Sequence, residues 1–316
     1  MQLRPLGRTG LQIAPLVFGG NVFGWTADEA TSFRLLDAFL AAGGNAIDTA
    51  DVYSRFVPGN QGGESETILG KWFKARGHRQ RVVLITKCGM AMGDAGKGLG
   101  RAHILSAVEA SLRRLQTDYI DVYMAHHDDP DTPLEETLEA FAQLVRQGKA
   151  RAIAGSNYTA PRLAAALATS QRLGLPRFDV LQPRYNLYDR ADFEGELQAL
   201  CIRESVAVIP YFALAAGFLT GKYRSQADLV KSPRGPRVAN MLDARGLRIL
   251  AAMDQVAAAS GATHAQIALA WLLRRPGVTA PIVSATSLEQ LAATMQAIDV
   301  QLDAAAVARL DAASAA

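Results

Sequence analysis

The stretch VVLITKC at residues 82–88, followed by YIDVYMAHH at residues 119–127, decides the fold of this chain. Each is a short β-branched, apolar run that ends near an ionisable side chain, Lys87 in the first and His126 in the second. Between them, apolar residues at 104, 108, 112 and 115 recur with the spacing of one helix face. A strand, a helix and a strand in this order predict a parallel pair, because parallel strands need a crossover connection.

The same alternation runs along the whole chain of 316 residues. Apolar runs that read as strands lie at 16–18, 45–48, 82–87, 120–126, 152–156, 180–182, 206–211 and 281–284. Helical segments separate them, and another follows the last. Strand–helix pairs repeated in this way predict an α/β fold, a (β/α)8 TIM barrel, as one domain over residues 1–316. An open doubly wound sheet is the alternative, but no glycine-rich dinucleotide turn follows the first strand. The GKGLG run at 96–100 follows the third strand at a distance, not the first, so it is not that dinucleotide turn. We expect a flexible loop there.

Three pairs of the type Ser/Thr-x-x-Glu/Gln predict where helices begin, because such residues can satisfy each other's backbone N–H groups. The pairs are Thr26 with Glu29, Thr132 with Glu135, and Ser287 with Gln290. An irregular stretch at 224–240 carries Lys231, Arg234 and Arg237. It is either a solvated loop or a mobile flap over a ligand.

Composition narrows the class of protein. Lys and Arg total 33 against 30 Asp and Glu, a net charge of +3 that is too small for a nucleic-acid footprint. Two cysteines make no disulfide framework and favour a reducing compartment. No apolar run reaches the roughly 20 residues needed to span a bilayer, and the N-terminus lacks a secretory signal. We therefore expect a cytoplasmic protein without membrane or nucleic-acid partners. No His, Asp and Glu cluster has metal-ligand spacing, so we expect no metal.

Ionisable side chains gather where the expected strands end, which is the catalytic face of such barrels. Asp48 ends the second strand, Tyr53 follows in the same loop, Lys87 ends the third and His126 ends the fourth. Taken singly, each has a structural interpretation as a cap, a solvated lysine or a core imidazole. Together they predict a tuned acid–base group. An ammonium lowers the pKa of a tyrosine, and an aspartate keeps that lysine charged and oriented, as carbonyl chemistry requires.

Amide and hydroxyl side chains follow the later strands. Ser156 and Asn157 end the fifth strand, Gln182 ends the sixth and Tyr211 ends the seventh. These residues could hold an amide-bearing ligand, with its ring stacked on the tyrosine.

These motifs, in order, resemble the aldo-keto reductase superfamily. They are LGRTG, IDTADVY, GESE, LITK, YIDVYMAHHDDPDTPLEETL, GKARAIAGSN, LQPRYN and FLTGKY, and they cover nearly the whole chain. The resemblance implies reversible, NAD(P)H-dependent reduction of a small aldehyde or ketone on a (β/α)8 barrel, closed at the bottom by an N-terminal β-hairpin around residues 3–13. Tyr53 would be the proton donor, Lys87 and Asp48 its tuning pair, and His126 the residue that orients the carbonyl.

The resemblance also implies the ligand-binding residues. The substrate pocket would include Trp25, Phe56 and His127. NADPH would be the preferred cofactor, with NADH possible, and it would be held by Ser156, Asn157, Gln182, Tyr211, Phe212, Leu214, Gly217, Lys222, Ser284, Thr286, Ser287, Gln290 and Thr294.

Two departures from the family pattern concern the cofactor. Phe-Ala-Leu at 212–214 stands where the family often has Ser-Pro-Leu, and Thr286 stands where it often has arginine. Two rival functions remain open. One is a non-catalytic, cofactor-sensing subunit like the β subunits of potassium channels, and the other is a Schiff-base aldolase that uses Lys87. The sequence does not name the substrate or the oligomeric state.

Overall fold

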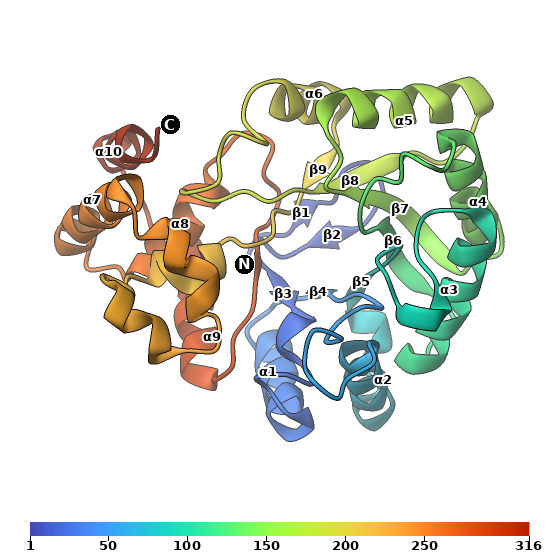
Figure 1. The fold of residues 1–316 in the computed structure, drawn as a ribbon, viewed down its shortest axis with the longest axis horizontal. Coiled ribbons are helices and arrows are strands. Elements are labelled where there is room, and N and C mark those ends of the chain that lie inside the picture. Colours follow the sequence, from blue (N-terminus) through green and yellow to red (C-terminus); the bar gives the residue numbers. More distant parts are fainter. Residues whose placement is uncertain (316) are drawn as a thin grey trace.

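A parallel sheet forms the centre of the molecule (Figure 1). The computed structural model describes residues 1–315, and within them the sheet has eight strands in the order β10-β3-β4-β5-β6-β7-β8-β9. The bounds are β3 Val17–Gly19, β4 Ala46–Asp48, β5 Val83–Cys88, β6 Ile120–Ala125, β7 Ala150–Ser156, β8 Phe178–Gln182, β9 Ala207–Val208 and β10 Ile282–Val283.

Backbone hydrogen bonds join the two ends of this sheet. Thr279 N donates to Val208 O at 2.8 Å, and Ile282 N donates to Pro210 O at 2.9 Å. The segment that leads into β10 therefore pairs with β9 and its extension, which closes the ring of strands. The expected (β/α)8 barrel is confirmed. The seventh and eighth strands are shorter than the sequence indicated, because the backbone leaves regular pairing soon after Val208 and Val283.

Helices lie outside the strands, with α1 to α5 following one another around the barrel (Figure 1). The α-helices are α1 Glu29–Ala41, α2 Glu64–Arg76, α3 Arg101–Leu115, α4 Leu134–Arg146, α5 Ala160–Leu173, α6 Glu196–Glu204, α7 Ala244–Ser260, α8 His264–Leu273, α9 Leu288–Met295 and α10 Ala304–Ser314. Short 3-10 turns are η1 Gly20–Val22, η2 Arg79–Arg81, η3 Gly93–Ala95, η4 Ala215–Thr220, η5 Gln226–Lys231, η6 Gly235–Met241 and η7 Gln296–Asp299.

Strand alternation divides the buried apolar side chains into two cores. In β5, Val83 and Ile85 point into the barrel, whereas Leu84 between them packs among the helices. Successive side chains of a strand point to opposite faces, so every barrel strand feeds both cores. The interior core is filled by Leu6, Leu11, Ile13, Val17, Ala46, Val83, Ile85, Val122, Met124, Ala152, Ala154, Val180, Ala207, Ile209, Ala280 and Ile282.

An N-terminal hairpin plugs one end of the barrel, as expected. Strands β1 (Arg4–Pro5) and β2 (Gln12–Ile13) pair in antiparallel fashion, and Leu6, Leu11 and Ile13 join the interior core. The turn passes very close to the start of β8. A Cβ on Gly7, whose φ is +59°, would lie 2.2 Å from the carbonyl oxygen of Asp179, so only glycine fits there.

Two of the three predicted helix starts are wrong in detail. Helix α1 is capped by Asp28, whose carboxylate accepts from Thr31 N at 2.8 Å, and not by Thr26. Pro133 stands at the N-cap of α4, while the Thr132 hydroxyl donates to Asp129 Oδ2 at 2.7 Å. At α1 an aspartate replaces the threonine of the pattern as the cap, and at α4 an aspartate binds the threonine hydroxyl outside the helix.

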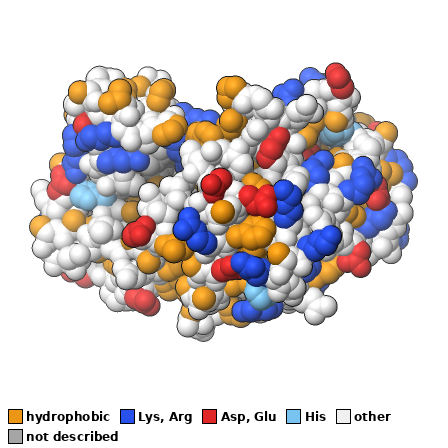
Figure 2. Space-filling model, turned by 90° about the horizontal axis from the view of Figure 1, so that it is seen from below, with side chains coloured by type: hydrophobic (Ala, Val, Ile, Leu, Met, Phe, Trp, Pro, Cys, Tyr) orange, Lys and Arg blue, Asp and Glu red, His pale blue; other side chains and the backbone are white. Residues whose placement is uncertain are grey.

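Basic and acidic side chains are interspersed on the face shown in Figure 2. No single helix of residues 1–315 is long and apolar enough to cross a membrane; α7 and α8, bent by 95° at their junction, pass that test only as a pair. Nor do these residues contain three His, Cys, Asp or Glu side chains placed to hold a metal ion. Both cysteines are buried and free.

Candidate active site

The barrel interior determines which side chains reach the catalytic rim. Val83 and Ile85 face inward, so Lys87, two residues further along β5, faces the same way. The same alternation at the ends of β4 and β6 turns Asp48 and His126 toward the axis. Three residues that are far apart in sequence therefore meet above one apolar core.

Lys87 is the centre of this group. Its side chain is fully buried, and Nζ donates to Asp48 Oδ2 at 2.7 Å, to Thr49 O at 2.7 Å and to Tyr53 OH at 3.2 Å. The other carboxylate oxygen of Asp48 accepts from Gln182 Nε2 at 2.8 Å. The three donor positions of the ammonium are thus used, and its direction is fixed.

Electrostatics keep this lysine charged. Burial by itself would lower the pKa of Lys87, but Asp48 and Tyr53 outweigh it and hold the pKa above its usual value of 10.5. A Schiff-base aldolase needs the opposite, a neutral amine in an apolar site. The ion pair with Asp48 therefore counts against the aldolase.

The pKa of Tyr53 differs from what the sequence led us to expect. Burial raises the pKa of the phenol above 10, and this effect exceeds the lowering by Lys87. The expectation that Lys87 lowers the pKa of Tyr53 is correct for the direction of its own contribution and wrong for the net result. The phenol consequently keeps its proton at neutral pH.

His126 lies beside the phenol. The two rings are 5.8 Å apart, edge to face, and His126 is buried. Burial, with a smaller contribution from Lys87, holds the pKa of His126 well below 6.5, so the imidazole is neutral. Its Nδ1 has no hydrogen-bond partner within residues 1–315. His127 stacks on it at 5.7 Å and is exposed at the rim.

The predicted amide-binding residues form one connected network. The Ser156 hydroxyl donates to Gln182 O at 2.9 Å, and Asn157 Nδ2 donates to Ser156 Oγ at 3.0 Å and to His126 O at 3.1 Å. The Tyr211 hydroxyl donates to Asn157 Oδ1 at 2.8 Å. This last bond fixes the edge of the Tyr211 ring and leaves its face available as a wall.

The loop after β9 holds an unusual backbone. Phe212, Ala215 and Ala216 have φ of 54°, 48° and 55°, and Gly217 has 97°. Positive φ costs a residue other than glycine of order 1–3 kcal/mol and is found mostly at ligand clamps and active sites. Successive N–H groups in such turns can form a concave anion site. The predicted residue Leu214 lies within this strained stretch, and Lys222, which is exposed, follows it.

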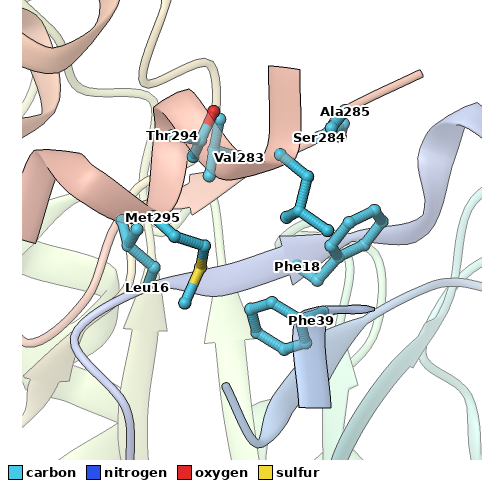
Figure 3. Close-up of a pocket in the computed structure, with 9 residues that line it drawn as sticks. Leu16, Phe18, Phe39, Val283, Ser284, Ala285, Thr294 and Met295 are labelled. Carbon is cyan, nitrogen blue, oxygen red and sulfur yellow. The ribbon is translucent and has the colours of Figure 1, made fainter. Parts of the chain in front are cut away.

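The predicted cofactor-binding residues around β10 and α9 do not all lie at the same place. Ser287 caps α9 by accepting from Gln290 N at 3.2 Å, as expected. Gln290 Oε1, however, accepts from the backbone N and Oγ1 of Thr286, both at 3.0 Å, and not from Ser287 N. Thr294 lies deeper, in an apolar hollow between β3, α1 and α9 that does not admit a water molecule (Figure 3).

Asn21 is a rim residue that the sequence reasoning missed. It lies in η1, directly after β3, and its Oδ1 accepts from the Ser284 hydroxyl at 2.6 Å. The two residues directly follow the neighbouring strands β3 and β10, which pair in parallel. The strand alternation that identifies Lys87 could have drawn attention to Asn21. Val17 and Gly19 occupy the inward positions of β3, and Asn21 is the next residue in that series.

The predicted pocket residues Trp25 and Phe56 pack edge to face, with ring centroids 5.1 Å apart. The irregular stretch at 224–240 contains the turns η5 and η6 and carries Arg234 and Arg237 onto these rings. The structure thus places the stretch against Trp25 and Phe56, and whether it moves over a ligand stays a prediction.

A sequence comparison decides the family. The model of the Aldo/keto reductase family matches residues 15–315. The chain belongs to the aldo/keto reductase family. The resemblance noted in the motifs is therefore confirmed, and the match extends over all eight barrel strands and the rim residues between them.

Relatives of this aldo/keto reductase are named as oxidoreductases and as a channel subunit. An uncharacterized oxidoreductase, YrpG, from Bacillus subtilis is 35% identical, covering 96% of this chain and 93% of the relative. Norsolorinic acid reductase stcV from Emericella nidulans is 34% identical over 95% of this chain and 77% of its own. A probable voltage-gated potassium channel subunit beta from Oryza sativa is also 34% identical, over 95% and 92%.

Proposed function

We propose that this aldo/keto reductase reduces a small aldehyde or ketone to an alcohol with NAD(P)H, and that Tyr53 donates the proton. The observation that carries the proposal is a protonated phenol held 3.2 Å from a buried, charged lysine, with a neutral imidazole beside it. The buried Lys87–Asp48 ion pair that holds this phenol carries a desolvation cost. It becomes useful when charge develops on a carbonyl oxygen next to it.

The residues present fit a nicotinamide cofactor. The Tyr211 face and the neighbouring Ser156 and Asn157 would hold the nicotinamide end, and the strained backbone at 212–217 would hold the phosphates. When bound, the cofactor supplies the hydride that the carbonyl carbon receives. Storing several kcal/mol of backbone strain in a loop that binds nothing would be hard to explain.

The protein's own groups would handle the proton. The Tyr53 hydroxyl gives its proton to the carbonyl oxygen, and the Lys87 ammonium stabilises the tyrosinate that remains. Asp48 and Thr49 keep the ammonium in place through their 2.7 Å hydrogen bonds. Neutral His126 orients the same oxygen from the other side of the phenol. Each group is used in the protonation state that its surroundings favour.

Substitution of Tyr53 by phenylalanine tests the proposal. Tyr53→Phe should reduce kcat for an aldehyde by about 10²–10⁴, the usual contribution of a positioned general acid, because only the hydroxyl is removed. Cofactor affinity, measured by fluorescence titration, should change little. A variant that keeps half its turnover would show that Tyr53 is not the acid.

The same experiment separates the second candidate function. Two relatives named as probable potassium channel β subunits, from Oryza sativa and Arabidopsis thaliana, are 34% and 33% identical to this chain. A cofactor-sensing subunit would bind NADPH and show no turnover with any member of a broad panel of aldehydes, ketones and sugars. Measurable turnover that depends on Tyr53 would exclude a purely regulatory role.

A further inference from the structure

Two arginines and two aromatic rings form a cation–aromatic cluster on the rim, made of Trp25, Phe56, Arg234 and Arg237. The guanidinium of Arg234 lies 5.1 Å from the Trp25 ring centroid. That of Arg237 lies 5.5 Å from the Trp25 ring and 5.5 Å from the Phe56 ring. Both guanidinium groups are thus gathered on one aromatic corner.

Neither guanidinium of this cluster has an ion pair or a side-chain hydrogen bond within residues 1–315. The other basic residues of the same stretch are paired. Arg224 binds Asp254 at 2.6 Å, and Lys231 binds Asp228 at 2.7 Å. The chain therefore supplies carboxylates to this stretch, and it leaves the two arginines that face the rim without one.

The unpaired charges act on each other. Burial, and then the charge of Arg237, lower the pKa of Arg234. Glu64, the first residue of α2, does not relieve them, because its carboxylate accepts from the backbone N–H groups of Gln61, Gly62 and Ser54. An anion placed between the guanidinium groups would offset this repulsion and accept hydrogen bonds from both.

One residue of the cluster belongs to the same loop as the proposed proton donor. Phe56 is three residues after Tyr53 in the loop that follows β4. That loop is tied to the loop carrying Trp25, because the Ser54 hydroxyl donates to Phe23 O at 2.9 Å and Asn60 Nδ2 donates to Gly24 O at 3.0 Å. A ligand whose carbonyl reaches the phenol can therefore extend its other end toward the cluster.

We propose that the cation–aromatic cluster selects planar carbonyl substrates that carry an anionic group, a carboxylate or a phosphate. The anion binds the two guanidinium groups, and the planar part packs against Trp25 and Phe56. This inference rests on the proposed reductase function and names the substrate class of that site. Trp25 and Phe56 bias the choice toward an aromatic or conjugated substrate, because a flat ring fills an edge-to-face aromatic corner well.

A matched pair of substrates tests the inference. 4-Carboxybenzaldehyde carries the anion, and methyl 4-formylbenzoate has the same ring without the charge. In the Arg234→Gln/Arg237→Gln variant, kcat/KM for the acid should fall about 10–150-fold, the range for lost charge-assisted hydrogen bonds. For the ester it should change less than about threefold. Arg224→Gln, a control on the same stretch, should leave the acid-to-ester ratio of kcat/KM unchanged. The Arg234→Lys/Arg237→Lys variant, which keeps both charges, should recover much of the wild-type ratio.

Three outcomes would overturn the inference. One is an equal loss for acid and ester in the glutamine variant. Another is a loss that appears only in KM for NADPH, which would assign the arginines to the cofactor's phosphates.

The third outcome concerns binding without turnover. Benzoate, titrated without cofactor, should quench the fluorescence of partly buried Trp25, since Trp72 and Trp271 are fully buried, and the glutamine variant should not respond. If neither aldehyde is reduced but benzoate binds in this way, the reductase proposal fails and the anion site stands. No response in the wild type rejects the anion site.

Discussion

Replacing Lys87 by methionine tests the buried ion pair at the centre of the site. The substitution keeps an unbranched side chain that is one atom shorter and removes the ammonium. Asp48 is then left buried with only Gln182 as a partner, because Nζ no longer donates to Oδ2. Breaking one side of a buried ion pair typically destabilises a protein by about 3–5 kcal/mol. We expect that loss in the free energy of unfolding by urea, measured at pH 7.

A double-mutant cycle makes the expectation sharper. Asp48→Asn alone should also destabilise, because it leaves the Lys87 cation buried without its carboxylate. In the Asp48→Asn/Lys87→Met variant both charges are absent. Its destabilisation should be smaller than the sum of the single effects by roughly 3 kcal/mol, since each single variant carries an uncompensated charge. Additivity within about 0.5 kcal/mol would refute the claim that the two side chains form one charged unit.

The Lys87→Met variant also tests the proton chemistry. Lys87 lowers the pKa of Tyr53 against the larger effect of burial, so its removal should raise that pKa further. Reduction needs the phenol and should persist to higher pH, whereas oxidation of the alcohol needs tyrosinate and should require higher pH. The pH at which reduction declines and the pH at which oxidation rises should therefore both increase, while kcat for reduction falls because the tyrosinate formed during reduction loses its cation. Unchanged pH–rate profiles would show that Lys87 does not act on Tyr53.

Two further predictions concern the cofactor and a buried acid. We expect kcat/KM to favour NADPH over NADH in the wild type, and Thr286→Arg should raise the ratio by about 10–150-fold, because the family resemblance implies a cofactor phosphate beside this position and a guanidinium would bind it more strongly than neutral donors; a wild type that prefers NADH would contradict this. Burial, and then Glu66, raise the pKa of Asp51 from 3.8 to about 8. The free energy of unfolding should therefore fall as pH rises from about 4 to about 8, and Asp51→Asn should remove most of that fall. Urea unfolding at each pH measures this dependence. If the free energy of unfolding falls by the same amount in the wild type and in Asp51→Asn, Asp51 is not its source.

The sequence by itself determined the barrel and the inner part of the site. The alternation of apolar runs with helical periods predicted the strand order, because each buried parallel strand requires a crossover. Within each strand the inward parity is fixed by the side-chain period of two, so Asp48, Lys87 and His126 had to face the same axis. The cap at Ser287 was likewise predictable from a local pattern, whereas the hairpin at the bottom was expected from the family resemblance. These features depend on residues that are close together in the chain.

Only the tertiary structure decided the features that depend on competition between distant groups. The net pKa of Tyr53 is set by how deeply the phenol is buried against one lysine, and no spacing in the sequence gives that balance. The pairing of Asn21 with Ser284, 263 residues away, exists because the first and last strands of the barrel, β3 and β10, lie side by side. The placement of Arg234 and Arg237 on Trp25 depends on the path of a long irregular loop. Such a path follows from packing across the rim, which no local periodicity encodes.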